Sequence, residues 1–518
     1  MQLSVSLSFL LAGVLMMLTA PADALPHERR SKSVTLPLKR VEMARGVHPQ
    51  INLQQNINRS IRRLARMTGR EEPSARELHE NLQRRVLQIE GPEVLEKRYN
   101  RHGVPKKTAS KSKATAAKTG STLAATNFRG QGNGNGKQGQ NGGGRQQQGS
   151  GAQQQQGGAQ QQAAASAAVT PDPVAQADTP TDNDSLGLDI EAQDVGYLAT
   201  VQMGTPPRDF LLLMDSGSAD LWVGAENCAS QAGGGCGNHI FLGPQSSSSF
   251  VDTNSPFSVT YGTGSVSGDI ITDNLAIAGL QLSQHTFGVA TTESVDFSGD
   301  GTPFDGLMGL AQSTLSEQQT LTPIESLAKA NLVPAAIVSY KISRLADNKN
   351  DGEITFGSLD TTKFDSATLV EIPNVNTQGF WEGALDSVSV NNQDLGLQGR
   401  TAILDTGTTL MVVPAADAAT IHAQITGAKS DGQGGFTVPC TTTDSVALTF
   451  GKQEFAIDPR DIAFTPVDPN DPTGDCVSGI SSGQIGGADE WLVGDVFLKN
   501  AYFSTNVDKN TVSLAKLV

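Results

Sequence analysis

Cysteine and histidine are scarce in this sequence of 518 residues, which contains four cysteines and seven histidines. No histidine is spaced to complete a zinc set with the cysteines, so a cysteine-based metal site is disfavoured. The HExxH motif of zinc hydrolases is also absent. The cysteines allow three disulfide pairings and are consistent with secretion; they are Cys228, Cys236, Cys440 and Cys476.

Long apolar runs are missing beyond the first 24 residues. The run from Leu7 to Leu18 precedes Ala22-Asp23-Ala24, which has the small-x-small pattern of a cleavage site. We therefore predict a signal peptide over residues 1–24, since the run is short for a membrane anchor. The C-terminus lacks the hydrophobic tail of a lipid-anchor signal. We expect a secreted protein with no membrane partner, and an acidic vacuole is the alternative location.

Basic residues are scarce after residue 177, where 42 acidic residues face 13 basic ones. The first 177 residues have the opposite balance, with 11 acidic and 25 basic residues. A strongly acidic region disfavours nucleic acid as a partner, because like charges repel. It suits an acidic medium, although we interpret most scattered aspartates as maintaining solubility.

The basic region over residues 25–126 is interpreted as a pro-segment. A cationic arm can cover an anionic cleft and loosen when acid protonates the carboxylates. Nucleic-acid binding is the alternative, which a secretory signal disfavours. Ser74-Ala75-Arg76-Glu77 has capping-box spacing, and apolar residues follow at helical intervals, so this part can form a helix.

Residues 127–177 are predicted to form a disordered spacer. From Gly130 to about Ala168 the sequence is almost wholly Gly, Gln, Asn, Ala and Ser. Such residues cannot bury enough apolar surface to offset the entropy of ordering. The glutamine runs could instead promote association.

Two similar tetrapeptides lie 190 residues apart, Asp215-Ser216-Gly217-Ser218 and Asp405-Thr406-Gly407-Thr408. Each follows an apolar run that predicts a buried strand. A second repeat follows each one, Phe304 to Gly309 and Trp491 to Asp495. Repeated order at matching distance indicates a duplicated half-unit that supplies one carboxylate to a shared cleft. Gly217 and Gly407 let the chain turn where a Cβ would obstruct it.

Short β-branched runs alternating with Gly and Asn turns predict a mainly β body after residue 178. Helix signals are few. Thr322-Pro323-Ile324-Glu325 predicts a capped helix start, and Pro414 opens a run to Gly427.

These motifs, with Trp222 and the segment from Val259 to Ser265, resemble the pepsin-like aspartic proteases over Leu188 to Val518. The resemblance is to the fungal type of secreted endopeptidase. It implies a mainly β, bilobal fold of two duplicated β-barrel-like lobes, over 189–370 and 371–518, with a cleft between them. It also favours the disulfides Cys228–Cys236 and Cys440–Cys476.

The resemblance assigns roles to named residues. Asp215 and Asp405 would be catalytic, supported by the hydroxyls of Ser218 and Thr408. Tyr261, Gly262 and Thr263 would belong to a flap over the substrate, with Tyr261 hydrogen-bonded to Trp222. Without the aspartate motifs, the flap segment would be interpreted as an exposed hairpin. Pocket residues are assigned by weaker alignment, and each is also interpretable as core: Leu213, Leu307, Phe380, Ile403 and Phe297.

We therefore predict a monomeric aspartic endopeptidase, made as a zymogen and active in acid on polypeptides, with no metal or organic cofactor. Its own pro-segment would be an intramolecular inhibitor. Apolar pockets would favour bulky hydrophobic residues beside the scissile bond. The alternative is a catalytically silent binding or inhibitor protein with the same fold, which would be expected to have lost an aspartate, an elbow hydroxyl or the flap tyrosine.

Overall fold

The computed structural model describes two helical stretches near the N-terminus and most of the chain from residue 196 onward. The described residues are 34–37, 39–40, 48–67, 70–90, 174–175, 190–191, 196–261, 264–299, 302–347, 349–483 and 489–518. The predicted signal peptide and most of the predicted spacer lie outside them. No helix within these ranges is long and apolar enough to cross a membrane.

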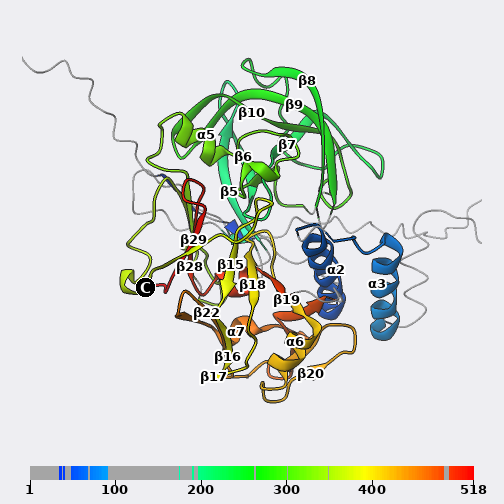
Figure 1. The fold of residues 1–518 in the computed structure, drawn as a ribbon. Coiled ribbons are helices and arrows are strands. Elements are labelled where there is room, and N and C mark those ends of the chain that lie inside the picture. The colour runs from blue at the N-terminus through cyan, green and yellow to red at the C-terminus, as the bar shows by residue number, and fades with distance from the viewer. Residues whose placement is uncertain are drawn as a thin grey trace, which may run out of the picture. The chain divides into compact units, whose positions relative to one another are not determined.

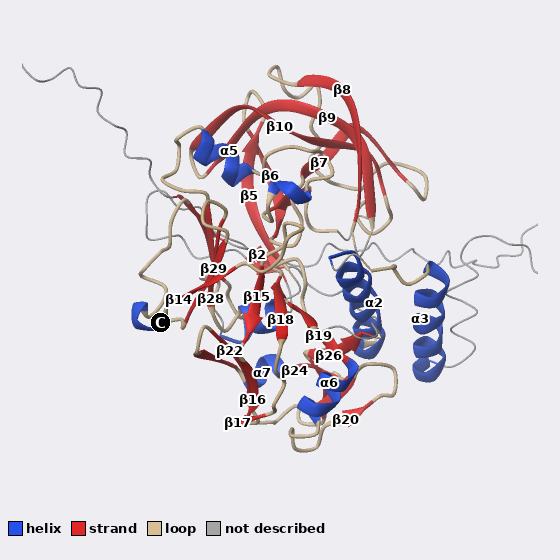
Figure 2. Cartoon of the chain, in the orientation of Figure 1, coloured by secondary structure: helices blue, strands red, loops and turns tan. Residues whose placement is uncertain are grey.

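Strands predominate in the described residues (Figure 2), so the predicted mainly β class is confirmed. The largest sheet has eight strands and carries the first aspartate motif at the end of one of them. In order across the sheet they are β2 (Lys39–Arg40), β5 (Tyr197–Met203), β6 (Arg208–Asp215), β11 (Gly306–Gly309), β7 (Leu221–Ser230), β10 (Leu280–Glu293), β9 (Ser265–Ile277) and β8 (Val251–Thr260).

Three further sheets are built from the C-terminal part of the chain. The five-stranded sheet comprises β15 (Glu382–Leu385), β18 (Arg400–Leu404), β27 (Glu490–Val493), β19 (Met411–Pro414) and β26 (Ile480–Gly483). One four-stranded sheet comprises β17 (Gln393–Asp394), β16 (Ser387–Val390), β22 (Val446–Phe450) and β23 (Gln453–Ile457). The other comprises β20 (Lys429–Ser430), β21 (Phe436–Pro439), β25 (Asp475–Ser478) and β24 (Ala463–Pro466).

A six-stranded sheet combines strands from both sides of residue 370, the predicted limit between the lobes, so that limit does not divide the sheets. Its strands are β1 (Val34–Pro37), β13 (Glu353–Phe356), β12 (Ile337–Lys341), β28 (Tyr502–Asn506), β29 (Thr511–Ala515) and β14 (Val370–Pro373). A separate two-stranded sheet pairs β3 (Val174–Ala175) with β4 (Ile190–Glu191).

The repeated motifs have the same strand arrangement. The strand that ends in the first motif, β6, pairs in parallel with β11, which also pairs antiparallel with β7. In the second copy, β18 pairs in parallel with β27, which also pairs antiparallel with β19. The two segments recognised as second repeats therefore support the strands that deliver the aspartates.

Short helices connect the strands of the body. They are α5 (Pro323–Lys329), α6 (Ala415–His422), α7 (Pro459–Ile462), α8 (Asp495–Leu498) and the 3₁₀ turns η1 (Ser313–Leu315), η2 (Leu345–Asp347) and η3 (Ser366–Thr368). The predicted capped start is present in α5, where the Glu325 carboxylate accepts from the Thr322 amide at 2.9 Å. The helix predicted to run to Gly427 ends earlier, at His422.

Two long helices precede the body, α2 (Pro49–Met67) and α3 (Ala75–Glu90), and they lie side by side (Figure 1). The Ser74 hydroxyl accepts from the Glu77 amide at 3.2 Å, which bears out the capped helix expected there. The helix α2 was not predicted. Its apolar residues nevertheless recur at helical spacing and are buried: Leu53, Ile57, Ile61 and Leu64.

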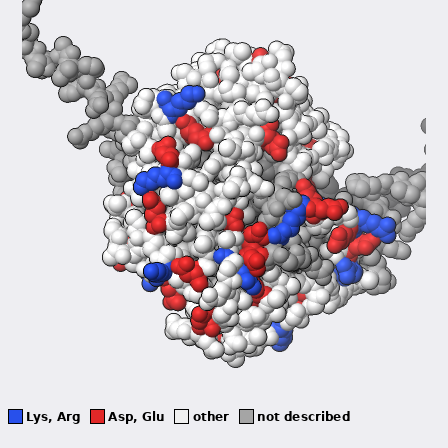
Figure 3. Space-filling model, in the orientation of Figure 1, with Lys and Arg blue, Asp and Glu red and all other residues white. Residues whose placement is uncertain are grey.

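Charges on the face shown in Figure 3 are spread singly and in small groups, and several acidic side chains have a Lys or Arg beside them. The described residues also include exposed ion pairs, such as those of Lys429 with Asp475 and of Lys509 with Glu371. Exposed pairs of this kind contribute little to stability.

Candidate active site

The two aspartate motifs fold into matching turns. Asp215 is the last residue of β6 and Asp405 directly follows β18, and both are fully buried. One oxygen of each carboxylate accepts from the glycine amide of its own motif at 2.9 Å. The other oxygen accepts from a hydroxyl at 2.6 Å, that of Ser218 in the first turn and that of Thr408 in the second. Each carboxylate is thus fixed in the same way.

A second set of hydroxyls joins the turns, which the sequence analysis did not foresee. The Ser216 amide donates to the Thr406 hydroxyl and the Thr406 amide donates to the Ser216 hydroxyl, each at 2.9 Å. The Ser216 hydroxyl donates to the Leu404 carbonyl at 3.1 Å, and the Thr406 hydroxyl donates to the Met214 carbonyl at 2.8 Å. Each turn is therefore anchored to the strand of the other.

The elbow glycines allow the carboxylates to approach. A Cβ on Gly217 would lie 2.5 Å from Oδ1 of Asp405, and a Cβ on Gly407 would lie 2.3 Å from Oδ1 of Asp215. Such distances are shorter than any side chain tolerates. Each glycine thus makes room for the carboxylate of the opposite motif.

Arg63, in α2, contacts both carboxylates. Its Nη2 lies 2.5 Å from Oδ1 of Asp215 and 2.8 Å from Oδ1 of Asp405, and its Nε lies 2.5 Å from Oδ2 of Asp405. The side chain is 14% exposed. One nitrogen within hydrogen-bond distance of both oxygens shows that the structure brings the predicted aspartates together. From the sequence, Arg63 was only one of many basic residues in the region over residues 25–126.

Burial and charge act together on these groups. Burial, the largest influence, raises the pKa of Asp405 above its usual range, and neighbouring Asp215 adds to this rise, while Arg63 and the hydrogen bonds from Thr408 and Gly407 oppose it. Burial alone would lower the pKa of Arg63, but its charge and hydrogen-bond interactions with both aspartates raise it. The guanidinium therefore stays charged while it occupies the site.

Aromatic side chains lie beside the first motif. The Trp222 indole donates to the Tyr261 hydroxyl at 2.8 Å, as the resemblance implies. The ring centroid of Phe297 lies 5.4 Å from that of Trp222 and 5.6 Å from that of Tyr261. Burial, and then nearby acidic charge, raises the pKa of Tyr261. The other two flap residues, Gly262 and Thr263, lie outside the described residues.

The predicted pocket residues separate into two apolar clusters. Leu213, Leu307 and Phe297 join the aromatic cluster of Trp222 and Tyr261. Phe380 and Ile403 belong to a second cluster that also contains Val412 and Leu492. Leu64 of α2 is part of this second cluster. The helix α2 therefore inserts a leucine where pocket residues were predicted.

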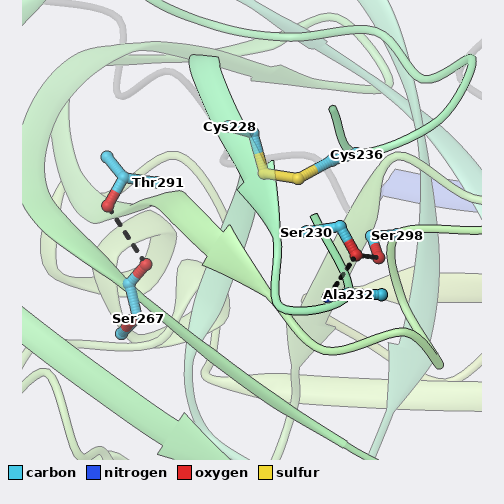
Figure 4. Close-up of a disulfide and its surroundings, with 7 residues drawn as sticks. All are labelled: Cys228, Ser230, Ala232, Cys236, Ser267, Thr291 and Ser298. Atoms are coloured by element: carbon cyan, nitrogen blue, oxygen red, sulfur yellow. Dashed lines mark hydrogen bonds between the residues drawn. A yellow bond between two sulfur atoms is a disulfide. The ribbon is translucent and has the colours of Figure 1, made fainter. Parts of the chain in front are cut away.

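Both disulfides favoured by the resemblance are present, Cys228–Cys236 (Figure 4) and Cys440–Cys476. Within the described part of the chain, the one grouping of potential metal ligands consists of Cys228, Cys236 and Glu293. Since both cysteine sulfurs are in a disulfide, neither is available as a thiolate ligand.

The letters of a GxSxG nucleophile elbow, which would suggest a serine hydrolase, occur at Gly479 to Gly483. Their central residue, Ser481, is fully buried within β26, and its hydroxyl donates to the Met411 carbonyl at 3.5 Å. This serine is therefore a strand residue, not an exposed nucleophile between a strand and a helix.

Paired, mirrored aspartate turns in a mainly β chain are the arrangement expected of aspartic proteases. Residues 196–517, more than half of the chain, match the family described as eukaryotic aspartyl protease, and the chain belongs to that family.

Three relatives illustrate the similarity. A protein of Trichophyton verrucosum named "Probable aspartic-type endopeptidase CTSD" is 36% identical over 344 residues, covering 66% of this chain and 65% of that protein. The "Aspartic-type endopeptidase ctsD" of Aspergillus fumigatus is 36% identical over 343 residues, covering 66% and 70%. "Pepsin A" of Bos taurus is 31% identical over 336 residues, covering 62% and 84%. The match thus spans just under two thirds of the Trichophyton protein.

Proposed function

We propose that this protein is an aspartic endopeptidase that is made as a zymogen and acts in acidic medium. The observation that carries this proposal is the pair of buried carboxylates of Asp215 and Asp405, held by matching hydrogen bonds and bridged by one guanidinium nitrogen. The names of its relatives support the same reaction class.

The chemistry follows from the proximity of the carboxylates. Two carboxyl groups this close do not both ionise readily, so they share a proton; aspartic proteases are a well-known example of this behaviour. The ionised group takes a proton from a water molecule as it attacks the peptide carbonyl, and the protonated group donates to the carbonyl oxygen. The pKa values belong to the pair, so neither aspartate is assigned the proton.

Supporting residues fix this geometry. Ser218 and Thr408 hold one oxygen of each carboxylate and leave the other directed at the shared position, now occupied by Arg63. Tyr261 would close over a bound peptide with Gly262 and Thr263, and Trp222 orients its hydroxyl. Closure would exclude water and order an extended substrate.

Occupation by α2 supports the zymogen proposal. Arg63 satisfies both carboxylates and Leu64 fills the apolar cluster of Phe380, Ile403 and Leu492, so a substrate would have to displace this helix. Acid would weaken the contact by protonating the carboxylates. The same apolar clusters would favour bulky hydrophobic side chains beside the scissile bond.

We further propose the layout expected from the sequence. Residues 1–24 would be a signal peptide, 25–126 a pro-segment and 127–177 a spacer, followed by lobes over 189–370 and 371–518. The repeated strand arrangement around the two motifs supports the duplication. The protein would be a secreted monomer, with an acidic vacuole as the alternative location.

Substitution of either aspartate tests the proposal. We expect Asp215→Asn and Asp405→Asn each to abolish hydrolysis of an unfolded protein at about pH 3 to 4, near the ordinary aspartate pKa. Asp394→Asn, on an exposed residue of β17, is the matched control. A statine-type compound should block the wild type. Inactivity of a folded wild-type chain from which the pro-segment has been removed would instead favour the silent binding protein.

A further inference from the structure

A second arginine of the pro-segment is buried against the C-terminal part of the chain. Arg85, in α3, is 1% exposed, and its Nη1 lies 2.7 Å from Oδ2 of Asp431, whose side chain is 8% exposed. Gln54, which contacts Arg85, precedes Arg63 by nine residues of α2, or about 14 Å along the helix axis. This ion pair is therefore separate from the contact with the paired aspartates.

The loop over residues 431–435, between β20 and β21, orients its carboxylate without help from the pro-segment. Oδ1 of Asp431 accepts from the Gln433 amide at 2.7 Å and from the Gly435 amide at 3.0 Å, and the Asp431 amide donates to the Gly435 carbonyl at 3.0 Å. These bonds direct Oδ2 toward Arg85. The acceptor is thus built by residues that remain after the pro-segment is removed.

Gly435 keeps this acceptor accessible. A Cβ at this position would lie 2.1 Å from Oδ2 of Asp431 and 2.8 Å from Cδ2 of Leu53 in α2. Any larger residue would therefore displace both the carboxylate oxygen and the pro-segment helix.

The pro-segment presents one guanidinium to this loop from a joined pair of helices. Gln54 Oε1 accepts from Nη2 of Arg85 at 3.0 Å and from Nε at 3.4 Å. The Asn58 side chain donates to the Leu78 carbonyl at 2.8 Å, which links α2 to α3. A guanidinium can bind the carboxylate and the amide oxygen at once, whereas the ammonium of a lysine has no such fork.

We propose that the 431–435 loop is a guanidinium-binding site outside the catalytic cleft, and that its ligand is Arg85 of the pro-segment, held there before and after cleavage. The proposal of retention after cleavage rests on the proposed zymogen. The polar contacts of this site join residues 54–85 to residues 431–435, and none of them uses the chain in between, so a cut in that chain leaves every contact in place. The released α2–α3 segment would therefore rebind the mature enzyme and inhibit it in trans.

Hydrogen exchange of the uncleaved full chain tests the site without needing any activity. We expect Arg85→Met and Asp431→Asn each to increase exchange throughout α3, while peptides around the aspartate motifs stay unchanged. Arg84→Met, on the exposed neighbouring arginine, is the matched control. Arg85→Lys keeps the positive charge but lacks the guanidinium fork, and it is the variant to measure if Arg85→Met or Asp431→Asn does not fold. Unchanged protection of α3 in the folded variants would overturn the proposal.

Dilution of the acid-activated full chain tests retention. Specific activity of the wild type should rise on dilution as the cleaved segment dissociates. In Asp431→Asn the apparent inhibition constant should increase by about 10- to 100-fold, the equivalent of a charged hydrogen bond. Identical dilution curves for Asp431→Asn and wild type, or a flat wild-type curve, would disprove retention. A chain that hydrolyses nothing at any dilution would count against the protease proposal, and hydrogen exchange would still decide the guanidinium site.

Discussion

Ser216 and Thr406 exchange hydrogen bonds between the two aspartate turns, with the amide of each donating to the hydroxyl of the other at 2.9 Å. The two residues lie 190 positions apart and both are fully buried. Because each hydroxyl also donates to a carbonyl of the opposite strand, the position of one aspartate depends on the other. Loss of either hydroxyl should therefore affect both stability and reactivity.

Thr406→Val should lower the free energy of unfolding by about 1 to 3 kcal/mol, because valine keeps the shape but leaves the buried Ser216 amide without an acceptor. Urea unfolding of the full chain measures this loss, and the rate of peptide hydrolysis should fall with it. The control is Thr420→Val on α6, where the hydroxyl is exposed and bonds only within the helix. Equal losses of stability in the two variants would contradict the special role of Thr406.

Arg63→Met should shift the pH at which the proposed zymogen becomes active toward neutrality. Methionine leaves the two buried carboxylates without their cation, which typically costs about 3–5 kcal/mol for a buried ion pair, so α2 should dissociate more readily. The measurement is the appearance of activity as a function of pH, followed together with the N-terminus of the chain. Arg76→Met, on an exposed arginine of α3, provides the control. An activation profile identical to that of the wild type would argue against Arg63 as the inhibitory residue.

Much of the site could be predicted because its signals are local. The Asp-Ser-Gly-Ser and Asp-Thr-Gly-Thr turns, the strands before them and the capped start of α3 each depend on a few consecutive residues. The contacts of Arg63 could not be predicted in this way, since they join residues 152 and 342 positions apart. Several basic pairs in the same arm look alike in sequence, and only the fold distinguishes them.

The helix α2 does have a pattern in the sequence, although it was not predicted. Leu53, Ile57, Ile61 and Leu64 recur at helical spacing, which would have placed Arg63 beside the buried face of a helix. The link between Ser216 and Thr406 is different in kind. Its recognition requires knowing that the two turns face each other, and this depends on the packing of two sheets.

Glu293 should make the protein less stable as the pH rises. Burial raises its pKa to about 8, and the residue is 1% exposed beside the Cys228–Cys236 disulfide. The pKa of Glu293 is higher in the folded chain than its value of about 4.3 in the unfolded chain. Its contribution to stability is therefore fully present below about pH 4.3 and is lost as the pH rises toward 8. Glu293→Gln should therefore stabilise the protein at pH 8 by on the order of 2–4 kcal/mol and change little at pH 4. Urea unfolding at several pH values measures this, with exposed Glu317→Gln as control, and a constant difference across the range would refute it.

His285 should have the opposite pH dependence. It is buried beside Phe287, its Nε2 has no hydrogen-bond partner, and burial lowers its pKa to about 4. Between about pH 6.5 and pH 4 the imidazole is protonated in the unfolded chain but neutral in the folded chain. The free energy of unfolding therefore falls as the pH decreases from about 6.5 to 4, and this residue causes no further loss below pH 4. His285→Leu should remove this loss. The difference in free energy of unfolding between the variant and the wild type should therefore favour the variant more at pH 4 than at pH 7, by on the order of 2–3 kcal/mol. Thermal unfolding at both pH values, with exposed His79→Leu as control, measures the difference. If the stability of the wild type did not fall relative to that of His285→Leu between pH 7 and pH 4, His285 would be protonated in the folded state. The acid tolerance of the fold would then depend on other groups.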